Sequence, residues 1–122
     1  MPPVFADAGY WIALWDPEDS LHEHAAAVAE GVGPDTIVTT QLVLIEALNY
    51  MSGRGEFRRR LAAQMVNELV EDPSVEVVHH SSAEFRAALE RYVSRSDHTW
   101  GFTDCVSFLV MEERGITGSA GL

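Results

Sequence analysis

The chain of 122 residues is long enough for one domain with its own apolar core and too short for two. Its formal net charge is −11 and arginine supplies all eight basic residues, which excludes any mechanism that needs a lysine and disfavours a general nucleic-acid binder, whose surface should be basic. The single cysteine, Cys105, excludes an internal disulfide and favours a reducing cytoplasm, and we expect neither a signal peptide nor a membrane span because no apolar run is long enough.

The N-terminal part of the chain predicts a strand followed by a helix. The short apolar run PVFAD, residues 3–7, is typical of a buried strand. Ser20 and Glu23 have the spacing of a capping box, so a helix through HEHAAAVAE is expected to start there. Gly31 and Gly33 are expected to close this helix.

The middle of the chain predicts a second strand and two helices. TIVTT, residues 36–40, is rich in β-branched residues and indicates a strand. Thr40 is expected to cap a helix over residues 41–51 that stops at Ser52-Gly53. A longer amphipathic helix is expected from about residue 56 to residue 71.

The C-terminal part predicts a third strand and two further helices. VEVVHH, residues 75–80, has the composition of a strand. Ser81 and Glu84 form a second capping-box pattern, which should start the helix AEFRAALERYV. Thr103 is expected to cap the last helix, DCVSFLVMEER, and Gly115 is expected to end it.

Strands that alternate with helices indicate right-handed βαβ units. The expected fold class is therefore α/β, a three-layer α/β/α sandwich with a central, mostly parallel sheet. We expect residues 1–122 to form this single domain, since no linker or internal repeat interrupts the chain.

Three acidic residues lie within otherwise apolar segments. Asp7 ends the first predicted strand, Glu46 lies in the helix QLVLIEALNYM, and Asp104 occupies the first turn of the last helix. In open parallel sheets, ligands bind at the carboxyl ends of the strands, where Asp7 is placed. Both helices are apolar nearly all round, so we expect them to be buried, and a buried carboxylate without a partner is costly.

Each acid also has a structural interpretation of its own. Asp7 can begin a helix, and an acid such as Asp104 gains about 0.3–1 kcal/mol from the dipole at a helix N-terminus. Glu46 can be a neutral, hydrogen-bonded core residue. One shared site explains all three acids together, so we favour it over three separate explanations.

A shared site of this kind is expected to bind a metal. Carboxylates placed close together repel and raise one another's pKa, and a divalent cation relieves that repulsion. Ligands that are all oxygen suit Mg²⁺ or Mn²⁺ rather than zinc. Such a cation activates water and neutralises charge on a phosphodiester. We therefore predict Asp7, Glu46 and Asp104 as catalytic residues and metal ligands of a phosphodiester hydrolase.

The segments that carry these acids resemble a known family. VFADAGYWIAL, TTQLVLIEALNYM and DHTWGFTDCVSFLVMEERGIT are similar, in this order, to the PIN domain family, and most of all to the toxin ribonucleases (VapC-like) of type II toxin–antitoxin pairs. The resemblance implies a small α/β/α sandwich in which Asp7, Glu46 and Asp104 bind Mg²⁺ or Mn²⁺ and single-stranded RNA is hydrolysed. It also implies a cognate antitoxin as partner, and a homodimer is considered as well.

The C-terminal end departs from the family pattern. After Gly115 the family continues through a strand to a fourth acidic or polar position, whereas this chain reads GITGSAGL, with Ser119 as the nearest polar residue. We therefore expect a shortened final strand and no fourth acid. A catalytically weak relic that acts only through protein binding stays open as an alternative. A phospho-acceptor receiver domain is disfavoured, because the paired acid and the late-strand lysine that it needs are missing.

Half of the basic residues lie in one stretch, RGEFRRR. One interpretation of these arginines is a solvated helix start. The other is an arginine patch that binds RNA phosphates or the acidic tail of an antitoxin. The residues concerned are Arg54, Arg58, Arg59 and Arg60.

Overall fold

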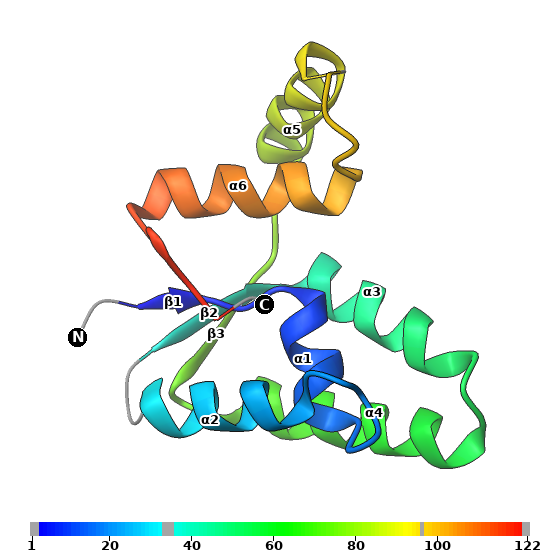
Figure 1. Cartoon of the computed structure of the whole chain (residues 1–122). Coiled ribbons are helices and arrows are strands. Elements are labelled where there is room, and N and C mark those ends of the chain that lie inside the picture. The colour runs from blue at the N-terminus through cyan, green and yellow to red at the C-terminus, as the bar shows by residue number, and fades with distance from the viewer. Residues whose placement is uncertain (1–2, 33–35, 96, 121–122) are drawn as a thin grey trace.

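A computed structural model describes residues 3–32, 36–95 and 97–120 (Figure 1). Within these residues, four parallel strands form one sheet in the order β3-β2-β1-β4. The strands are β1 (Val4–Phe5), β2 (Ile37–Thr40), β3 (Val75–Val78) and β4 (Gly118–Ser119). Phe5 pairs with Val38, and Thr40 pairs with Val78, so the carboxyl ends of the first three strands meet at one edge of the sheet.

Helices cover both faces of this sheet. In Figure 1, α5 and α6 lie above it, and α2 and α4 lie below it. The described helices are α1 (Ala8–Trp15), α2 (His22–Val32), α3 (Gln41–Ser52), α4 (Glu56–Glu71), α5 (Ser82–Ser94) and α6 (Phe102–Arg114). None of them combines the length and the apolar composition that crossing a membrane requires. The arrangement confirms the expected three-layer α/β/α sandwich around a parallel sheet.

Several helix ends lie where local side-chain chemistry predicted them. The hydroxyl of Thr40 caps α3 by accepting the backbone N–H of Val43 at 3.0 Å. Ser81 and Glu84 form the predicted capping box of α5, with hydrogen bonds of 2.8 and 3.1 Å. Gly115 ends α6 in the left-handed region (φ 64°), which glycine adopts without a steric penalty.

The predicted start of α2 at His22 is confirmed, but the capping box predicted for it is wrong. This helix begins at His22, and the turn before it is held by Asp19, whose carboxylate accepts the backbone N–H of Leu21 at 2.9 Å. The expected capping box of Ser20 and Glu23 is not what starts the helix. A carboxylate accepts a hydrogen bond more strongly than a hydroxyl does, which explains why the acid takes this role.

Other boundaries differ by a few residues. β1 covers two residues of the predicted strand 3–7, and β3 ends at Val78, two residues before the predicted end. Gly31 lies inside α2, which continues to Val32, and Gly33 lies outside the described residues. Strand ends depend on pairing with neighbouring strands, so the composition of the segment alone did not define them.

The core is centred on α1. Tyr10, Trp11 and Trp15 are 0%, 2% and 4% exposed. The ring centroid of Trp11 lies 5.0 Å from that of Tyr10 and 5.9 Å from that of Trp15. Aromatic pairs at such distances stabilise a core beyond the burial of their area. These rings therefore support the helix that begins directly after Asp7.

Candidate active site

Asp7 lies where β1 passes into α1. Its backbone is extended (φ −93°, ψ 178°), and its Oδ1 accepts the backbone N–H of Tyr10 at 2.9 Å, so Asp7 is the N-cap residue of α1. Asp7 therefore has the structural role of a helix cap, but this cap uses only one of its two carboxylate oxygens. The other oxygen, Oδ2, makes no hydrogen bond within the described residues.

A buried hydrogen-bond relay holds the backbone just before Asp7. The indole N–H of Trp11 donates to Oγ1 of Thr39 at 3.1 Å, and the hydroxyl of Thr39 donates to the carbonyl of Ala6 at 2.8 Å. Trp11, Thr39 and Ala6 are almost fully buried, so these polar groups depend on one another for partners. The relay joins α1, β2 and the end of β1, and thereby fixes the position of Asp7.

Glu46 lies on an exposed face of α3, and the prediction that this helix is buried all round is wrong. Val43, Leu44 and Ala47 are buried, whereas Glu46 is exposed and Ile45 is 44% exposed. The neighbours of α3 cover only part of its circumference, so apolar residues elsewhere on the helix reach the surface. Apolar composition on every side therefore did not guarantee packing on every side.

Asp104 lies in the first turn of α6 and is also exposed, in contrast to the buried position expected. The helix begins at Phe102 after the N-cap residue Gly101, so the prediction that Thr103 caps it is wrong. Oδ2 of Asp104 accepts the backbone N–H of Gly101 at 3.1 Å. An acid is favoured here because the helix dipole places partial positive charge at the N-terminus.

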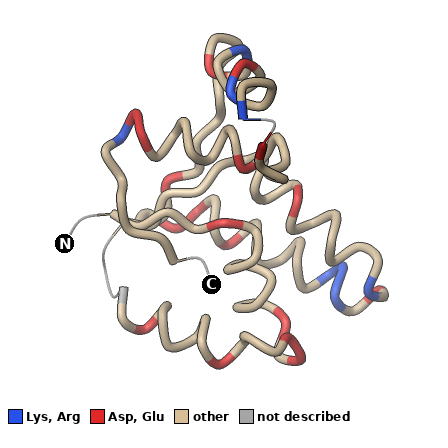
Figure 2. Tube along the Cα trace, turned by 45° about the horizontal axis from the view of Figure 1, so that its top comes forward, with Lys and Arg blue, Asp and Glu red and all other residues tan. Residues whose placement is uncertain are grey.

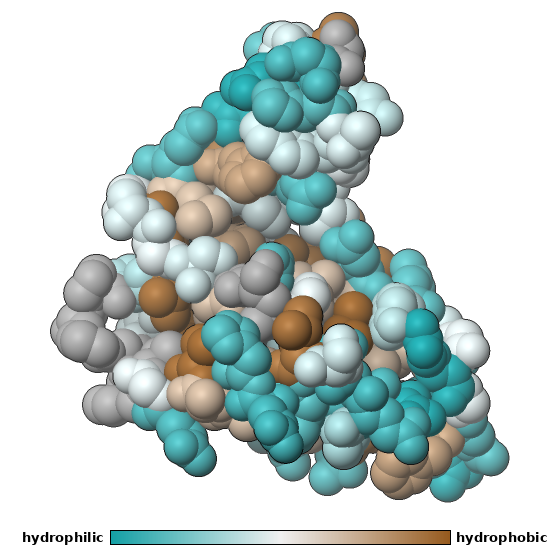
Figure 3. All heavy atoms as spheres, in the orientation of Figure 1, coloured by the Kyte–Doolittle hydropathy of each residue, from teal (hydrophilic) through white to brown (hydrophobic). Residues whose placement is uncertain are grey.

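The negative charges of Asp104 and Asp7 act on Glu46. The pKa of Glu46 is raised by desolvation and then by the negative charges of Asp104 and Asp7. Figure 2 shows that acidic positions are spread along the chain and outnumber the basic ones. Figure 3 shows a hollow in the surface between the part formed by α5 and α6 and the part formed by α3 and α4. Asp7, Glu46 and Asp104, called the acidic cluster below, thus come from three distant segments, and the first and last are near enough to Glu46 for their charges to act on it.

The donor chemistry of this cluster fits a hard divalent cation, but the side chains do not form a preformed metal site. Across residues 3–32, 36–95 and 97–120, no group of three or more His, Cys, Asp or Glu side chains is placed to hold a metal ion. Asp7 and Asp104 each direct one oxygen to a helix N-terminus. Carboxylate oxygens are preferred ligands of Mg²⁺ and Mn²⁺, and a cation would relieve the repulsion at Glu46. Joint coordination requires these side chains to turn toward a common point.

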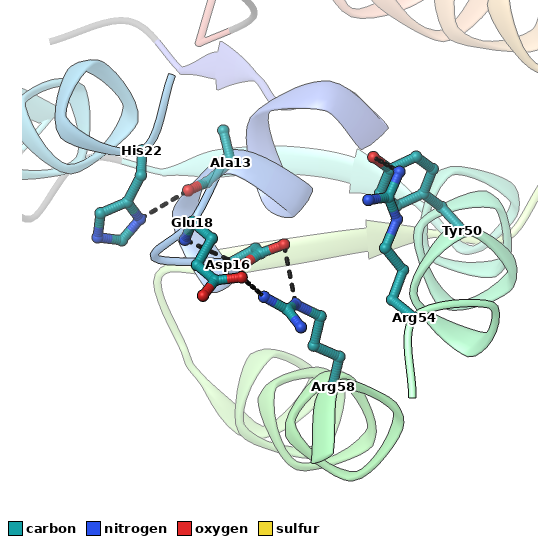
Figure 4. A network of polar contacts seen from close by, with 7 residues as sticks. All are labelled: Ala13, Asp16, Glu18, His22, Tyr50, Arg54 and Arg58. Carbon is teal, nitrogen blue, oxygen red and sulfur yellow. Dashed lines mark hydrogen bonds and ion pairs between the residues drawn. The ribbon is translucent and has the colours of Figure 1, made fainter. Parts of the chain in front are cut away.

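Two of the arginines in RGEFRRR are neutralised by carboxylates. Nε of Arg58 lies 3.1 Å from Oδ2 of Asp16, and the same guanidinium pairs with Glu18 (Figure 4). Arg60 pairs with Glu56 of the same helix at 2.7 Å. These contacts assign Arg58 to the structure of the protein rather than to an open arginine patch.

Arg54 and Arg59 differ from the other two arginines of the stretch. The guanidinium of Arg54 lies 4.4 Å from the centroid of the Tyr50 ring and donates a hydrogen bond to the Tyr50 hydroxyl (Figure 4). Within the described part of the chain, neither Arg54 nor Arg59 forms an ion pair with a carboxylate, although the charge of Arg54 helps to lower the pKa of Asp16. The positive charge available to an anion on this side of the molecule is therefore theirs.

A pocket of about 270 Å³ opens beside Asp7. The residues that line it are Asp7, Gly9, Ile12, Asp19, Leu21 and Tyr50. Sequence reasoning missed Asp19 and Tyr50 as candidate site residues. Tyr50 follows Glu46 by one helical turn, a spacing that was visible in the sequence. Asp19 carried no such signal, because only the path of the chain between α1 and α2 brings it to the pocket.

Comparisons with known proteins agree with this architecture. The family profile described as PIN domain matches residues 4–117. Ten chains of solved structures match, among them VapC20 of Mycobacterium tuberculosis, described as a sarcin-ricin loop cleaving toxin. That likeness has a TM-score of 0.88 at 24% sequence identity and covers 98% of this chain and 88% of the other. No curated protein matches the chain.

Proposed function

Since the chain belongs to the PIN domain family, we propose that it is a metal-dependent endoribonuclease that hydrolyses single-stranded RNA, and that it is the toxin of a toxin–antitoxin pair. The observation that carries the proposal is the PIN domain match over residues 4–117, and the action of the charges of Asp104 and Asp7 on Glu46 supports it. Asp7 and Asp104 each stabilise a helix N-terminus, but the negative charge that they place near Glu46 does not favour the fold. Such a cluster is typical of a site that binds a cation or a substrate.

Each acid has a defined part in this proposal. Asp7, Glu46 and Asp104 would hold Mg²⁺ or Mn²⁺ through their carboxylate oxygens. When bound, such a cation supplies activation of water and neutralisation of charge at the phosphate. The hydrogen bonds from Tyr10 and Gly101 restrict the side chains of Asp7 and Asp104. Glu46, with its raised pKa, takes up a proton more readily than an ordinary glutamate and so limits the repulsion when no cation is bound.

A cognate antitoxin is proposed as the protein partner. The likeness in fold to the toxin VapC20 supports this, as does an apolar stripe on α5 that is exposed in the isolated chain. The stripe consists of Phe85, Leu89, Tyr92 and Val93, which are 43%, 45%, 50% and 70% exposed. A homodimer would use an exposed apolar surface of the same kind and stays a prediction. The cytoplasmic location, where an RNA substrate is available, also stays a prediction.

The proposal is tested with the purified protein and a labelled single-stranded RNA. We expect cleavage that requires Mg²⁺ or Mn²⁺, stops with EDTA and is lost in Asp104→Asn. Asp72→Asn is the matched control, because Asp72 is an exposed acid in the turn between α4 and β3. A protein that binds the cation and cuts no RNA would favour the catalytically weak, partner-binding relic instead.

A further inference from the structure

The pocket beside Asp7 combines two acids, Asp7 and Asp19, with apolar and aromatic walls. Leu21 and Tyr50, two of its walls, are 45% and 41% exposed, although both are large apolar or aromatic side chains. Ile12 adds a further apolar contact. Its volume of about 270 Å³ lies below the range of roughly 300–1,000 Å³ for pockets that hold drug-sized ligands. A pocket of this size and lining suits one flat ring system.

Tyr50 connects this pocket with the acidic cluster. It follows Glu46 by four residues on α3, so the two side chains project from the same face of the helix. Arg54 holds the Tyr50 ring through a cation–π contact and a hydrogen bond to its hydroxyl (Figure 4). The chain thus presents a carboxylate, an aromatic ring and a guanidinium in succession. A single strand of RNA offers a phosphate to the guanidinium and a flat base to the ring, whereas the carboxylate faces the cation of the proposed site.

Asp19 adds a hydrogen-bond acceptor to the pocket. Its Oδ1 accepts the backbone N–H of Leu21 at 2.9 Å, and its carbonyl accepts the N–H of His22 at 3.0 Å, so the turn that carries it is restrained. Oδ2 of Asp19 makes no hydrogen bond within the residues that the structure describes. An ionised carboxylate only accepts hydrogen bonds. The pocket therefore favours rings that carry amino or imino donors.

We propose that this pocket binds the nucleobase adjacent to the scissile phosphate: Tyr50 stacks on the base, Asp19 accepts from its Watson–Crick edge, and Arg54 neutralises the neighbouring phosphate. The proposal rests on the ribonuclease function proposed above. Adenine, cytosine and guanine carry an amino group on that edge, whereas uracil presents one N–H between two carbonyl oxygens. A carboxylate repels those oxygens, so the pocket disfavours uracil at this position.

The test uses labelled oligouridylates that contain one adenosine, cytidine or guanosine, with the all-uridine strand as reference. We expect the unmodified protein with Mn²⁺ to cut beside the inserted base, with kcat/KM roughly ten-fold above that for the all-uridine strand. Asp19→Asn should lose most of this preference, because an amide both donates and accepts. Tyr50→Ala should lower kcat/KM on every strand by about ten-fold through lost stacking, whereas Tyr50→Phe should retain it.

Two variants serve as controls. Asp72 forms the same kind of turn as Asp19, with Oδ1 accepting the N–H of Ser74 at 2.8 Å, and Phe57 is a 74% exposed aromatic residue on α4. Asp72→Asn and Phe57→Ala should keep both rate and preference. Equal cleavage of all four strands, or an unchanged preference in Asp19→Asn, would overturn the base pocket and leave the ribonuclease standing. No cleavage of any strand would overturn the ribonuclease itself.

Discussion

Nε of Arg58 on α4 lies 3.1 Å from Oδ2 of Asp16 at the end of α1, and the side chain of Asp16 is only 8% exposed (Figure 4). The same guanidinium pairs with Glu18. The ion pairs therefore join α4 to the connection between α1 and α2. That connection also carries Asp19, so an arginine that resembled an RNA-binding residue in the sequence instead supports one wall of the proposed base pocket.

Asp16→Asn should destabilise the protein at neutral pH. Burial alone would raise the pKa of Asp16, but hydrogen bonds from Glu18 N–H and Arg58 and the charges of Arg58 and Arg54 outweigh it, and the pKa is lowered. A folded pKa below the unfolded value means that the stabilisation is complete above the ordinary value of about 4 and is lost as pH falls through the folded pKa. We expect a loss of about 1–3 kcal/mol at pH 7 in urea denaturation, which shrinks on acidification below about pH 4.

The exposed ion pair of Arg60 with Glu56 provides the comparison. Its side chains are 80% and 76% exposed, so Glu56→Gln should change the free energy of unfolding by less than about 0.5 kcal/mol. If Asp16→Asn costs no more than Glu56→Gln, the Arg58 contact does not hold α4 in place.

Glu46→Gln should stabilise the protein when no divalent cation is present. Desolvation and the charges of Asp104 and Asp7 raise the folded pKa of Glu46 above its ordinary value of 4.5. The folded state therefore binds this proton more tightly than the unfolded state, and stability falls as pH rises from the unfolded pKa toward the folded one. The uncharged amide of glutamine does not lose stability as pH rises. We therefore expect Glu46→Gln to have a higher Tm than the unmodified protein at pH 7 in EDTA, and the same Tm below about pH 4.

The exposed residue Glu68 on α4 gives a control for this substitution. Glu68→Gln should leave the difference in Tm between these two pH conditions the same as in the unmodified protein. A lower Tm for Glu46→Gln at pH 7 in EDTA would show that the carboxylate stabilises the fold and would weaken the case for a functional cluster.

Thr39→Val should be strongly destabilising despite its similar shape. The substitution leaves the indole N–H of Trp11 and the carbonyl of Ala6 buried without their partner. An unsatisfied buried group costs about 1–3 kcal/mol, so we expect a loss of at least about 2 kcal/mol in urea denaturation. Thr39→Ser keeps the hydroxyl and should cost clearly less; equal losses for the two variants would mean that packing of the methyl group, not the relay, matters here.

The sequence predicted those features that depend on neighbouring residues. The cap at Thr40, the capping box of Ser81 and Glu84 and the end of α6 at Gly115 all follow from side chains within a few positions. The alternation of strand and helix patterns was enough to predict the α/β/α layers. Residue composition and the spacing of capping residues were therefore enough to predict most of the architecture.

Features that depend on distant residues were not accessible in the same way. The exposure of Glu46 depends on how much of α3 its neighbours cover, and the partner of Arg58 lies 42 residues away in the chain. The strand order likewise depends on pairings between distant segments. Candidate acids could thus be named from the sequence, but their surroundings, including the pocket that Asp19 helps to form, could not.

Asp7 has two roles that substitution can separate. Asparagine caps a helix about as well as aspartate, so Asp7→Asn should keep its Tm in EDTA, whereas Asp7→Ala should lose about 1 kcal/mol with the hydrogen bond from Tyr10 N–H. If Asp7 also binds a cation, Mg²⁺ at 100 times its Kd should stabilise the unmodified protein by about 2.7 kcal/mol. The same Mg²⁺ concentration should stabilise Asp7→Asn and Asp104→Asn much less. Thermal unfolding with and without Mg²⁺ measures both effects. An equal Mg²⁺ response in the unmodified protein and both asparagine variants would reduce these acids to helix caps and remove the basis for a metal-dependent site.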